Sequence, residues 1–295
     1  IIAEAGVNHN GNEQTALDLV NAAKAAGADI VKFQTFNANR LVTIGAKTAK
    51  YQQRNSGITE SQLQMLQRYE LSEDIHIRLA DYCRLIGIEF LSTAFDSSSL
   101  SFLVHELDLK RLKVSSGDLT NGPFLLEHAR TGKDIILSTG MAGLAEIEAA
   151  LEVLSFGYLG AASASPSIMA FKEAYCSPEG RQAIKQKVTL LHCTTEYPAP
   201  FDDINLLAMN TIGAAFDLKV GYSDHSTGVV VPIAAVALGA TVIEKHFTLD
   251  KNSAGPDHMA SLDVSEFKFM VESLRCTSLS LGSNVKFSNG YEDEN

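Results

Sequence analysis

Closely spaced cysteines, an excess of basic residues and a membrane-length apolar run are all missing from this 295-residue sequence. Its four cysteines, Cys83, Cys176, Cys193 and Cys276, form no CxxC pair, which argues against a disulfide framework and favours a reduced, cytoplasmic protein. The net charge of −11 argues against nucleic acid as a partner, because binding its phosphates needs a concentrated basic surface. Without an apolar stretch of about 20 residues or a signal peptide, no membrane partner is expected either.

Eight apolar, β-rich segments recur along the chain. They show no clear alternation, which is typical of strands buried on both faces of a parallel sheet. Amphipathic segments separate them; one runs from Ser72 as N-cap to Gly87 as stop signal. Eight strand–helix units predict an α/β fold, a (β/α)8 TIM barrel over residues 1–282, since open doubly wound sheets usually have about six strands. The predicted strands are Ile1–Val7, Asp29–Phe36, Ile88–Phe95, Arg111–Ser115, Asp134–Ser138, Val188–Thr194, Lys219–Ser223 and Thr241–Phe247.

Three segments fall outside this regular spacing. Residues 45–60 are polar and follow the second strand, where a loop would cover a substrate. Residues 155–187 are rich in Ala, Ser and Gly, and we predict a peripheral insertion with a short helix that enters from the opposite face. Residues 283–295 lack periodicity and are interpreted as a tail or the start of a linker.

Reactive side chains collect at the carboxyl ends of the predicted strands, where TIM barrels carry out their chemistry. His225 and His246 end the seventh and eighth strands, which are neighbours in such a barrel. Either histidine alone is more readily explained as a hydrogen-bonded core residue. As a pair, two neutral imidazoles leave coordination positions open, which suits a divalent ion acting as Lewis acid. The other reactive residues at these ends are Glu4, Lys32, Gln34, Thr93, Lys113, Ser138 and Ser223.

Lys32 and Lys113 lie inside otherwise apolar strands, where a lysine is costly to bury unless a negative group pairs with it. Three interpretations stay open. The lysines pair with acidic side chains of the barrel, they bind an anionic ligand, or one of them forms a Schiff base. The acidic candidates are Glu4, Asp118 and Glu244. Glu4 is either such a partner or an acid tuned by burial to act as a base. An anion site would add the hydroxyls of Thr93, Ser116, Ser138 and Ser223.

Two loops and several further histidines complete the candidates. Tyr197 is held between prolines after the sixth strand and Asp257 lies on a constrained loop after the eighth; both suit a hydroxyl-rich ligand, and both are equally explained as rigid turns. We expect no ligand role for His9 and a place in the barrel wall for His192. The histidines on helical segments, expected on solvated faces, are His76, His105 and His128.

Eight ordered segments of the chain resemble those of the sialic acid synthases, and the resemblance covers residues 1–282. They are Ile2–Gly11 (IAEAGVNHNG), Val31–Phe36 (VKFQTF), Leu91–Phe95 (LSTAF), Leu112–Asp118 (LKVSSGD), Ile136–Met141 (ILSTGM), Leu191–Pro200 (LHCTTEYPAP), Gly221–Ser226 (GYSDHS) and Glu244–Asp250 (EKHFTLD).

The resemblance implies a (β/α)8 barrel that condenses phosphoenolpyruvate with N-acetylmannosamine, or a related hexosamine, to a nine-carbon 2-keto acid. Phosphate would leave by C–O cleavage, with Glu4 aiding the addition of water. A divalent ion, Mn2+ or Mg2+, would lie on His225 and His246. Family members are expected to be cytoplasmic homodimers. The resemblance places phosphoenolpyruvate on Lys32, Thr93, Lys113, Ser116, Ser138 and Ser223, with Glu4, Lys32 and Lys113 as catalytic residues. It places the sugar on Gln34, Asn55, Asp118, Tyr197 and Asp257.

The chain departs from the usual family pattern at Ala94, where proline is common, and at Asp118, where glutamate is common. Family members usually continue into an antifreeze-like domain that donates an arginine to the partner subunit's site, and residues 283–295 would begin the linker to it. Legionaminic and pseudaminic acid synthases are sister activities. A Schiff-base aldolase and a non-catalytic sugar-phosphate-binding barrel are the rival functions.

Overall fold

The computed structural model describes residues 1–43, 46, 48, 60–160, 165–286 and 290. Eight parallel strands close into one barrel in chain order, so the predicted (β/α)8 TIM barrel is confirmed. Every predicted strand corresponds to an observed one. The strands are β1 (Ile2–Gly6), β2 (Ile30–Thr35), β3 (Glu89–Ala94), β4 (Arg111–Val114), β5 (Asp134–Ser138), β6 (Val188–Cys193), β7 (Lys219–Asp224) and β8 (Ile243–His246).

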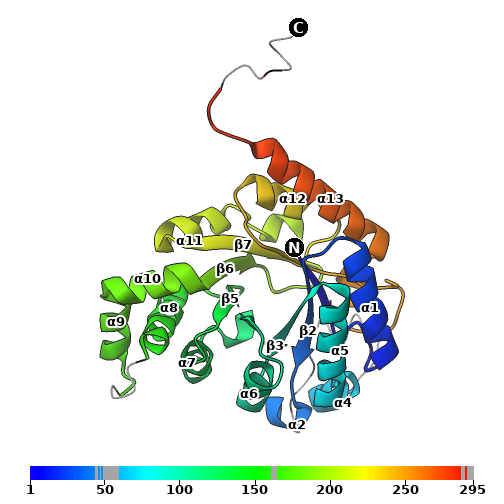
Figure 1. Cartoon of the computed structure of the whole chain (residues 1–295), viewed down its shortest axis with the longest axis horizontal. Coiled ribbons are helices and arrows are strands. Elements are labelled where there is room, and N and C mark those ends of the chain that lie inside the picture. The colour runs from blue at the N-terminus through cyan, green and yellow to red at the C-terminus, as the bar shows by residue number, and fades with distance from the viewer. Residues whose placement is uncertain (44–45, 47, 49–59, 161–164, 287–289, 291–295) are drawn as a thin grey trace.

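Helices surround these strands on the outside of the barrel (Figure 1). In the part of the chain that the structure describes, none has the length and apolar character that a membrane span requires. The helices are α1 (Glu13–Ala25), α2 (Ala38–Leu41), α4 (Gln62–Tyr69), α5 (Glu73–Ile86), α6 (Ser97–His105), α7 (Gly122–Arg130), α8 (Leu144–Leu159), α9 (Ile168–Cys176), α10 (Pro178–Lys187), α11 (Ala208–Phe216), α12 (Val230–Ala237) and α13 (Val264–Leu281), with short 3-10 turns at Ser116–Asp118, Phe201–Asp203 and His258–Ala260.

The predicted helix ends are confirmed by their hydrogen bonds. Ser72 caps α5 by accepting from the Ile75 amide, and Gly87 ends that helix in the left-handed conformation, with φ of 74°. Asp263 opens α13 with the predicted capping box to Glu266. These local sequence signals determine where α5 begins and ends and where α13 begins.

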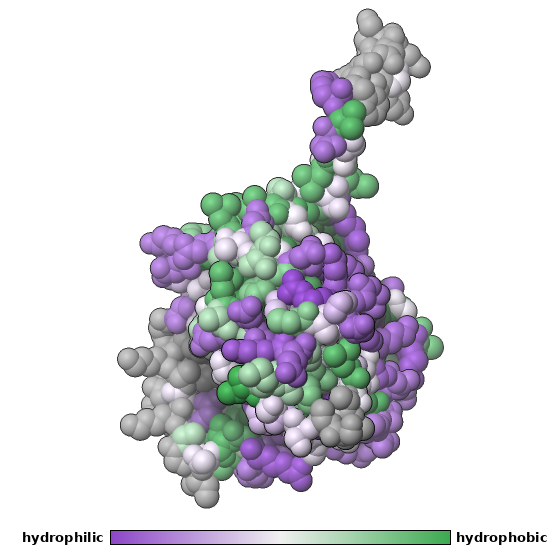
Figure 2. All heavy atoms as spheres, turned by 90° about the vertical axis from the view of Figure 1, so that its left-hand side faces the viewer, coloured by the Kyte–Doolittle hydropathy of each residue, from purple (hydrophilic) through white to green (hydrophobic). Residues whose placement is uncertain are grey.

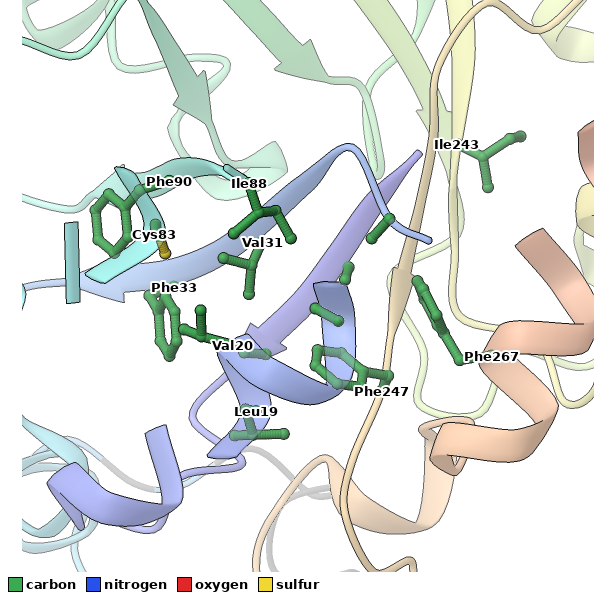
Figure 3. Packing of buried hydrophobic residues seen from close by; sticks show 14 of the residues in the cluster. Leu19, Val20, Val31, Phe33, Cys83, Ile88, Phe90, Ile243, Phe247 and Phe267 are labelled. Atoms are coloured by element: carbon green, nitrogen blue, oxygen red, sulfur yellow. The ribbon is translucent and has the colours of Figure 1, made fainter. Parts of the chain in front are cut away.

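An apolar layer between helices and strands holds the barrel from outside (Figure 3). Phe33 of β2 stacks on Phe90 of β3 with ring centroids 5.7 Å apart, and Leu19 of α1 belongs to the same buried cluster. Near α13, Phe247 packs on Phe267 at 5.2 Å. Large buried aromatic surfaces of this kind contribute much of the hydrophobic stabilisation of a domain.

A separate, small apolar cluster fills the interior of the barrel. Its buried members come from five strands: Ile2, Ile30, Leu91, Ile136 and Leu191. Side chains alternate along a strand, so the residue two positions later points to the same side. Those next inward positions are Glu4, Lys32, Thr93, Ser138 and Cys193. The apolar cluster is therefore the floor of the polar site.

The insertion before β6 begins later in the chain and contains more helix than the sequence indicated. Residues 155–159 still belong to α8, and two helices follow, α9 and α10, rather than one short helix. Phe171 of α9 packs edge-on against Phe156 of α8 at 5.1 Å. Figure 2, which faces this side of the molecule, shows hydrophilic and hydrophobic residues interspersed over it. The insertion thickens the outer helical layer.

Substituting Gly221 of β7 tests how closely β7 and β8 approach. A Cβ at this position would overlap the Val242 carbonyl oxygen and lie 2.7 Å from a Leu191 methyl group. We expect Gly221→Ala to lower the free energy of unfolding by about 1–3 kcal/mol, measured by urea denaturation. Gly143→Ala is the control, because its Cβ would meet nothing closer than a Glu146 oxygen at 3.8 Å. Equal denaturation midpoints for the two variants would contradict the prediction.

Candidate active site

A pocket of about 340 Å³ opens at the carboxyl ends of the strands. It brings together residues that lie far apart in the sequence, from β1 to the loop after β8. Twelve of the predicted site residues line it: Glu4, Lys32, Gln34, Thr93, Lys113, Ser116, Ser138, Tyr197, Ser223, His225, His246 and Asp257.

The parallel register explains how these side chains meet. Glu4 of β1 lies opposite Lys32 of β2 on one side and His246 of β8 on the other. Thr93 of β3 lies opposite Lys113 of β4. Because residues in register at the same level of a barrel point inward together, one ring of polar groups forms above the apolar floor.

Both buried lysines have carboxylate partners in this ring. Lys32 Nζ lies 2.6 Å from Glu4 Oε2 and 3.7 Å from Glu244 Oε2. Lys113 Nζ lies 3.7 Å from Glu244 Oε1, which also accepts a hydrogen bond of 2.9 Å from Ser223 Oγ. Pairing with Glu4 and Glu244 is thus confirmed, and Glu244 joins the two lysines.

The lysine amines also donate to hydroxyl groups, and Lys113 donates to the Val114 carbonyl at 3.2 Å as well. Lys32 donates to Thr93 Oγ1 at 3.2 Å and Lys113 donates to Ser138 Oγ at 2.7 Å. These contacts place cations and hydroxyls on the same side of the pocket. Such a set of donors has the composition of an anion-binding site.

Burial and neighbouring charges shift the pKa of all four ionisable groups, Glu4, Glu244, Lys32 and Lys113. Burial raises the pKa of Glu4 to about 8, helped by the nearby Glu244 carboxylate and opposed by Lys32. Burial opposes ionisation of Glu244 as well, but Lys113 and Lys32 together lower its pKa. Burial also opposes the charge of Lys32, yet Glu244 and Glu4 raise the pKa of that amine. Burial lowers the pKa of the Lys113 amine, with Glu244 acting in the opposite direction. With Glu4 protonated, Glu244 is the carboxylate that faces both amines, and a further anion beside them would help to keep both protonated.

Ser116 is held at the edge of this region by close contacts. Its Oγ accepts a 3.0 Å hydrogen bond from the Gly140 amide and lies 3.1 Å from Cys193 Sγ. A Cβ on Gly140 would lie 2.9 Å from the Ser116 hydroxyl and 2.7 Å from the Cys193 sulfur. Only glycine allows the backbone to approach this closely.

The two predicted histidines face each other across the other side of the pocket. Their ring centroids lie 5.6 Å apart, and Tyr197 lies against His225 with its ring centroid at 4.1 Å. His225 Nδ1 donates to the Thr194 carbonyl at 2.6 Å, which leaves Nε2 as its free nitrogen. Burial lowers the pKa of both imidazoles. Both rings are therefore neutral at pH 7 and able to act as metal ligands.

The donor set fits a divalent ion with several remaining positions. His246 Nδ1 is buried without a hydrogen-bond partner among the described residues, and Asp257 Oδ2 lies 3.9 Å from it. Burial raises the pKa of Asp257 to about 6, so its carboxylate is largely ionised at pH 7. Within the described ranges no cluster of three or more His, Cys, Asp or Glu is arranged to enclose a metal. Metal binding by His225 and His246 stays a prediction, and the fit is to an open site completed by water or substrate.

Of the predicted sugar-binding residues, Asp118 does not line the pocket and Asn55 lies outside the described residues. Asp118 is absent from the lining; its carboxylate accepts from Ser115 Oγ at 2.7 Å and stabilises the turn after β4. Neither lysine pairs with Asp118, so that alternative for the buried cations is wrong. A sugar contact by either residue stays a prediction.

Sequence reasoning assigned no binding role to Glu244 or to the apolar wall of the pocket. Glu244 is two residues before His246, and this period-two spacing alone puts both side chains on one face of β8. The sequence gives less indication of the apolar wall. Apolar spacing in Gln62–Tyr69 is typical of a helix, but it does not say which part of the barrel the helix covers. The wall residues are Val7, Phe36, Leu41, Met65, Leu66, Tyr69 and Phe95.

The expectation that the helical histidines are solvated was wrong for two of the three. His76 is buried between α5 and the barrel, with Nδ1 at 3.0 Å from the Ser72 carbonyl oxygen and Nε2 at 3.2 Å from the Gln34 carbonyl oxygen. Burial lowers its pKa, and the neutral ring donates its one N–H to one of these carbonyls. His128 is buried as well, with Nδ1 donating to the Phe124 carbonyl at 2.8 Å. An imidazole can be buried at modest cost when backbone carbonyls accept its N–H. His105 is exposed, as expected.

The raised pKa of Glu4 predicts a pH dependence of stability. Between its ordinary value of 4.5 and about 8, the folded state binds a proton that the unfolded state releases, so the free energy of unfolding falls as pH rises. We expect Glu4→Gln to flatten this fall between pH 5.5 and 8 in urea denaturation. Glu13→Gln is the control, because Arg78 lowers the pKa of that exposed carboxyl and places its titration below this range. An unchanged slope in Glu4→Gln would contradict the assignment.

Solved structures similar to this chain share its barrel. A sialic acid synthetase from Leptospira borgpetersenii, solved in complex with citrate, has a TM-score of 0.79 and 30% identity, covering 99% of this chain and 88% of that one. A spore coat polysaccharide biosynthesis protein from Bacillus subtilis has a TM-score of 0.74 and 32% identity, covering 99% and 75%.

Characterised relatives are similar over almost the whole chain. An N,N'-diacetyllegionaminic acid synthase from Campylobacter jejuni is 47% identical over 100% of this chain and 81% of its own length. One from Legionella pneumophila is 45% identical over 97% and 74%. The N-acetylneuraminate-9-phosphate synthase of Homo sapiens is 33% identical over 97% and 72%. The model of the NeuB family matches residues 19–286, and the chain therefore belongs to the NeuB family.

Proposed function

We propose that this chain is a sialic-acid-type synthase that joins phosphoenolpyruvate to the open-chain aldehyde of an N-acylated hexosamine. One observation carries the proposal: a lysine- and hydroxyl-lined anion site and a pair of neutral histidines face the same pocket of about 340 Å³. The first suits the phosphate and carboxylate of phosphoenolpyruvate, and the second suits activation of a carbonyl. Membership of the NeuB family supports it.

Phosphoenolpyruvate would lie on the buried cations. Lys32 and Lys113 balance its charge, and the hydroxyls around them donate to its oxygens. Neutral Glu4 removes one competing carboxylate from the site. The hydroxyl groups in reach of such a ligand are those of Thr93, Ser116, Ser138 and Ser223.

The aldehyde would lie on the histidine side. His225 and His246 would hold a divalent ion, Mn2+ or Mg2+, which when bound supplies Lewis-acid polarisation of the aldehyde oxygen. Tyr197 lies against both rings, so it keeps the imidazoles in place and presents its ring to the sugar. Asp257 lies beside His246 and would accept hydrogen bonds from sugar hydroxyls.

The reaction forms two bonds and breaks the bond from C2 to the phosphate oxygen, with Glu4 available for proton transfer. C3 of phosphoenolpyruvate attacks the aldehyde carbon, a water oxygen bonds to C2, and the bond between C2 and the phosphate oxygen breaks. Glu4 lies next to His246 in the strand register and holds a proton at neutral pH. Its carboxyl can donate that proton to the new alkoxide and then accept one from the attacking water. The second proton of that water leaves with the phosphate as the C2 hydroxyl becomes the carbonyl. The product is a nine-carbon 2-keto acid with inorganic phosphate.

A diacetylated hexosamine is the second candidate for the sugar, beside N-acetylmannosamine. The two legionaminic acid synthases are more similar to this chain than the N-acetylneuraminate-9-phosphate synthases are. The pocket also has an apolar wall that includes Met65 and Leu66. Methyl groups of a second acetamido substituent would be favourable against such a wall.

Phosphate release tests the reaction. With the full-length gene product, phosphoenolpyruvate and Mn2+, we expect phosphate only when a hexosamine is added, and none after chelation. Phosphoenolpyruvate labelled with ¹⁸O in the bridging position should pass the label to phosphate, because the C–O bond breaks. N-acetylmannosamine and its 4-acetamido-6-deoxy analogue are compared as substrates. Release without sugar, or no release with either, contradicts the proposal, and a borohydride-trapped pyruvate adduct would indicate the aldolase instead.

Histidine substitutions test the metal ligands. We expect His225→Ala and His246→Ala each to weaken Mn2+ binding by about 100-fold or more, measured by electron paramagnetic resonance of free Mn2+. His192→Ala is the matched control, since that imidazole of β6 bonds the Ile204 carbonyl at 2.7 Å and does not line the pocket. Unchanged Mn2+ affinity in both ligand variants would remove the pair from the mechanism.

A further inference from the structure

A second buried ion pair lies directly behind the histidines. Lys245 Nζ is 2.6 Å from Asp224 Oδ2, and both side chains have an exposed fraction of 0%. Neither residue lines the pocket. Their neighbours Ser223, Glu244 and His246 do, so alternation puts the pair on the outer side of β7 and β8, under the helices.

The pair encloses the backbone of His225. Asp224 precedes that histidine, and its Oδ1 accepts a hydrogen bond of 2.8 Å from the amide of Ser226, which follows it. Lys245 also donates to the Ser226 carbonyl. Since Lys245 immediately precedes His246 in the chain, one ion pair joins the residues that flank both histidines.

Asp224 and Lys245 are also the last residues paired between β7 and β8. In the β7–β8 register, Asp224 lies opposite Lys245 and no later residue of β7 is paired with β8. Beyond this point His225 is held by its own contacts to the loop after β6, through Thr194 and Ala199. On the outer side of the strands, this ion pair therefore links the ends of β7 and β8, while the hydrogen bond from Ser223 to Glu244 links them on the pocket side.

Stability alone is a weak explanation for two charges at this depth. Removing a lysine and an aspartate from water is costly, and well-packed apolar residues of similar size are often equally stable. What an apolar pair cannot supply is directed bonds that link Asp224, Ser226 and Lys245.

We propose that Asp224 and Lys245 are positioning residues that set the separation of His225 and His246 and thereby the affinity for the divalent ion. The proposal rests on the proposed metal role of the two histidines. It assigns the ion pair no contact with substrate. On the phosphoenolpyruvate side of the pocket, Lys32 and Lys113 have contacts of their own to Glu4, Thr93 and Ser138, none of which involves Asp224 or Lys245.

The test removes both charges together, because a single substitution would leave an unpaired buried charge that impairs folding. In Asp224→Asn/Lys245→Met we expect Mn2+ affinity to fall by about 10–100-fold, as for other groups that orient metal ligands. Phosphoenolpyruvate affinity, measured by titration calorimetry, should change by less than about twofold. In Asp224→Asn/Lys245→Gln, a neutral hydrogen bond can replace the ion pair, and part of the Mn2+ affinity should return.

A matched control removes a buried polar pair from the opposite side of the barrel. Thr35 Oγ1 and Ser92 Oγ lie 2.7 Å apart between β2 and β3 and do not line the pocket. Thr35→Val/Ser92→Ala should leave Mn2+ affinity unchanged.

Two results would overturn the proposal while leaving the function intact. One is unchanged Mn2+ affinity in Asp224→Asn/Lys245→Met alongside its loss in His225→Ala. The other is an equal fall of Mn2+ affinity, phosphoenolpyruvate affinity and unfolding midpoint, which would make the pair a general stabilising element. If His225→Ala and His246→Ala also keep Mn2+ affinity, the proposed metal site fails together with this inference.

Discussion

The contact on which the site depends is that of Glu244 with two buried lysines. One carboxylate lies 3.7 Å from both Lys32 and Lys113, and all three side chains are almost completely withdrawn from water. Burying a lysine in a barrel is unfavourable unless a carboxylate offsets its charge. Glu244 does this for two lysines at once. Because burial raises the pKa of Glu4, Glu244 is the carboxylate that offsets both amines, and an anionic substrate beside them would supply further negative charge.

The closed barrel places the lysines and the histidines on two different sides of one pocket. The parallel register sets Glu4 between Lys32 and His246, so the carboxyl borders both the anion side and the histidine side. The apolar floor beneath them, which includes Ile30 and Leu91, keeps water out of the barrel interior and keeps the local dielectric low. Low dielectric strengthens each of the ionic contacts above it. The polar side chains of the site and the apolar side chains of the floor are thus consecutive layers on the same strands.

Particular residues show how far the sequence could be used for prediction. Lys32, Lys113, His225 and His246 were identifiable because charged or titratable groups interrupt apolar strands, and a barrel brings the strand ends together. Asp118 looked equivalent by its position after β4, but its carboxylate bonds the local turn through Ser115. His76 and His128 looked solvated on helices, but their rings bond backbone carbonyls inside the fold. In each of these cases a contact between distant or folded-back segments decided the outcome.

The sequence by itself determined the eightfold strand–helix order, the helix caps at Ser72, Gly87 and Asp263, and the set of ionisable residues at the strand ends. These follow from local rules: side-chain periodicity, backbone preference and capping hydrogen bonds act over a few residues. Only the tertiary structure decided that Glu244 joins both lysines, that α4 supplies part of the apolar wall, and that Asp224 and Lys245 link the ends of β7 and β8. Those outcomes depend on distances between strands and on burial, because electrostatic strength and pKa are set by how completely the closed barrel removes each group from water.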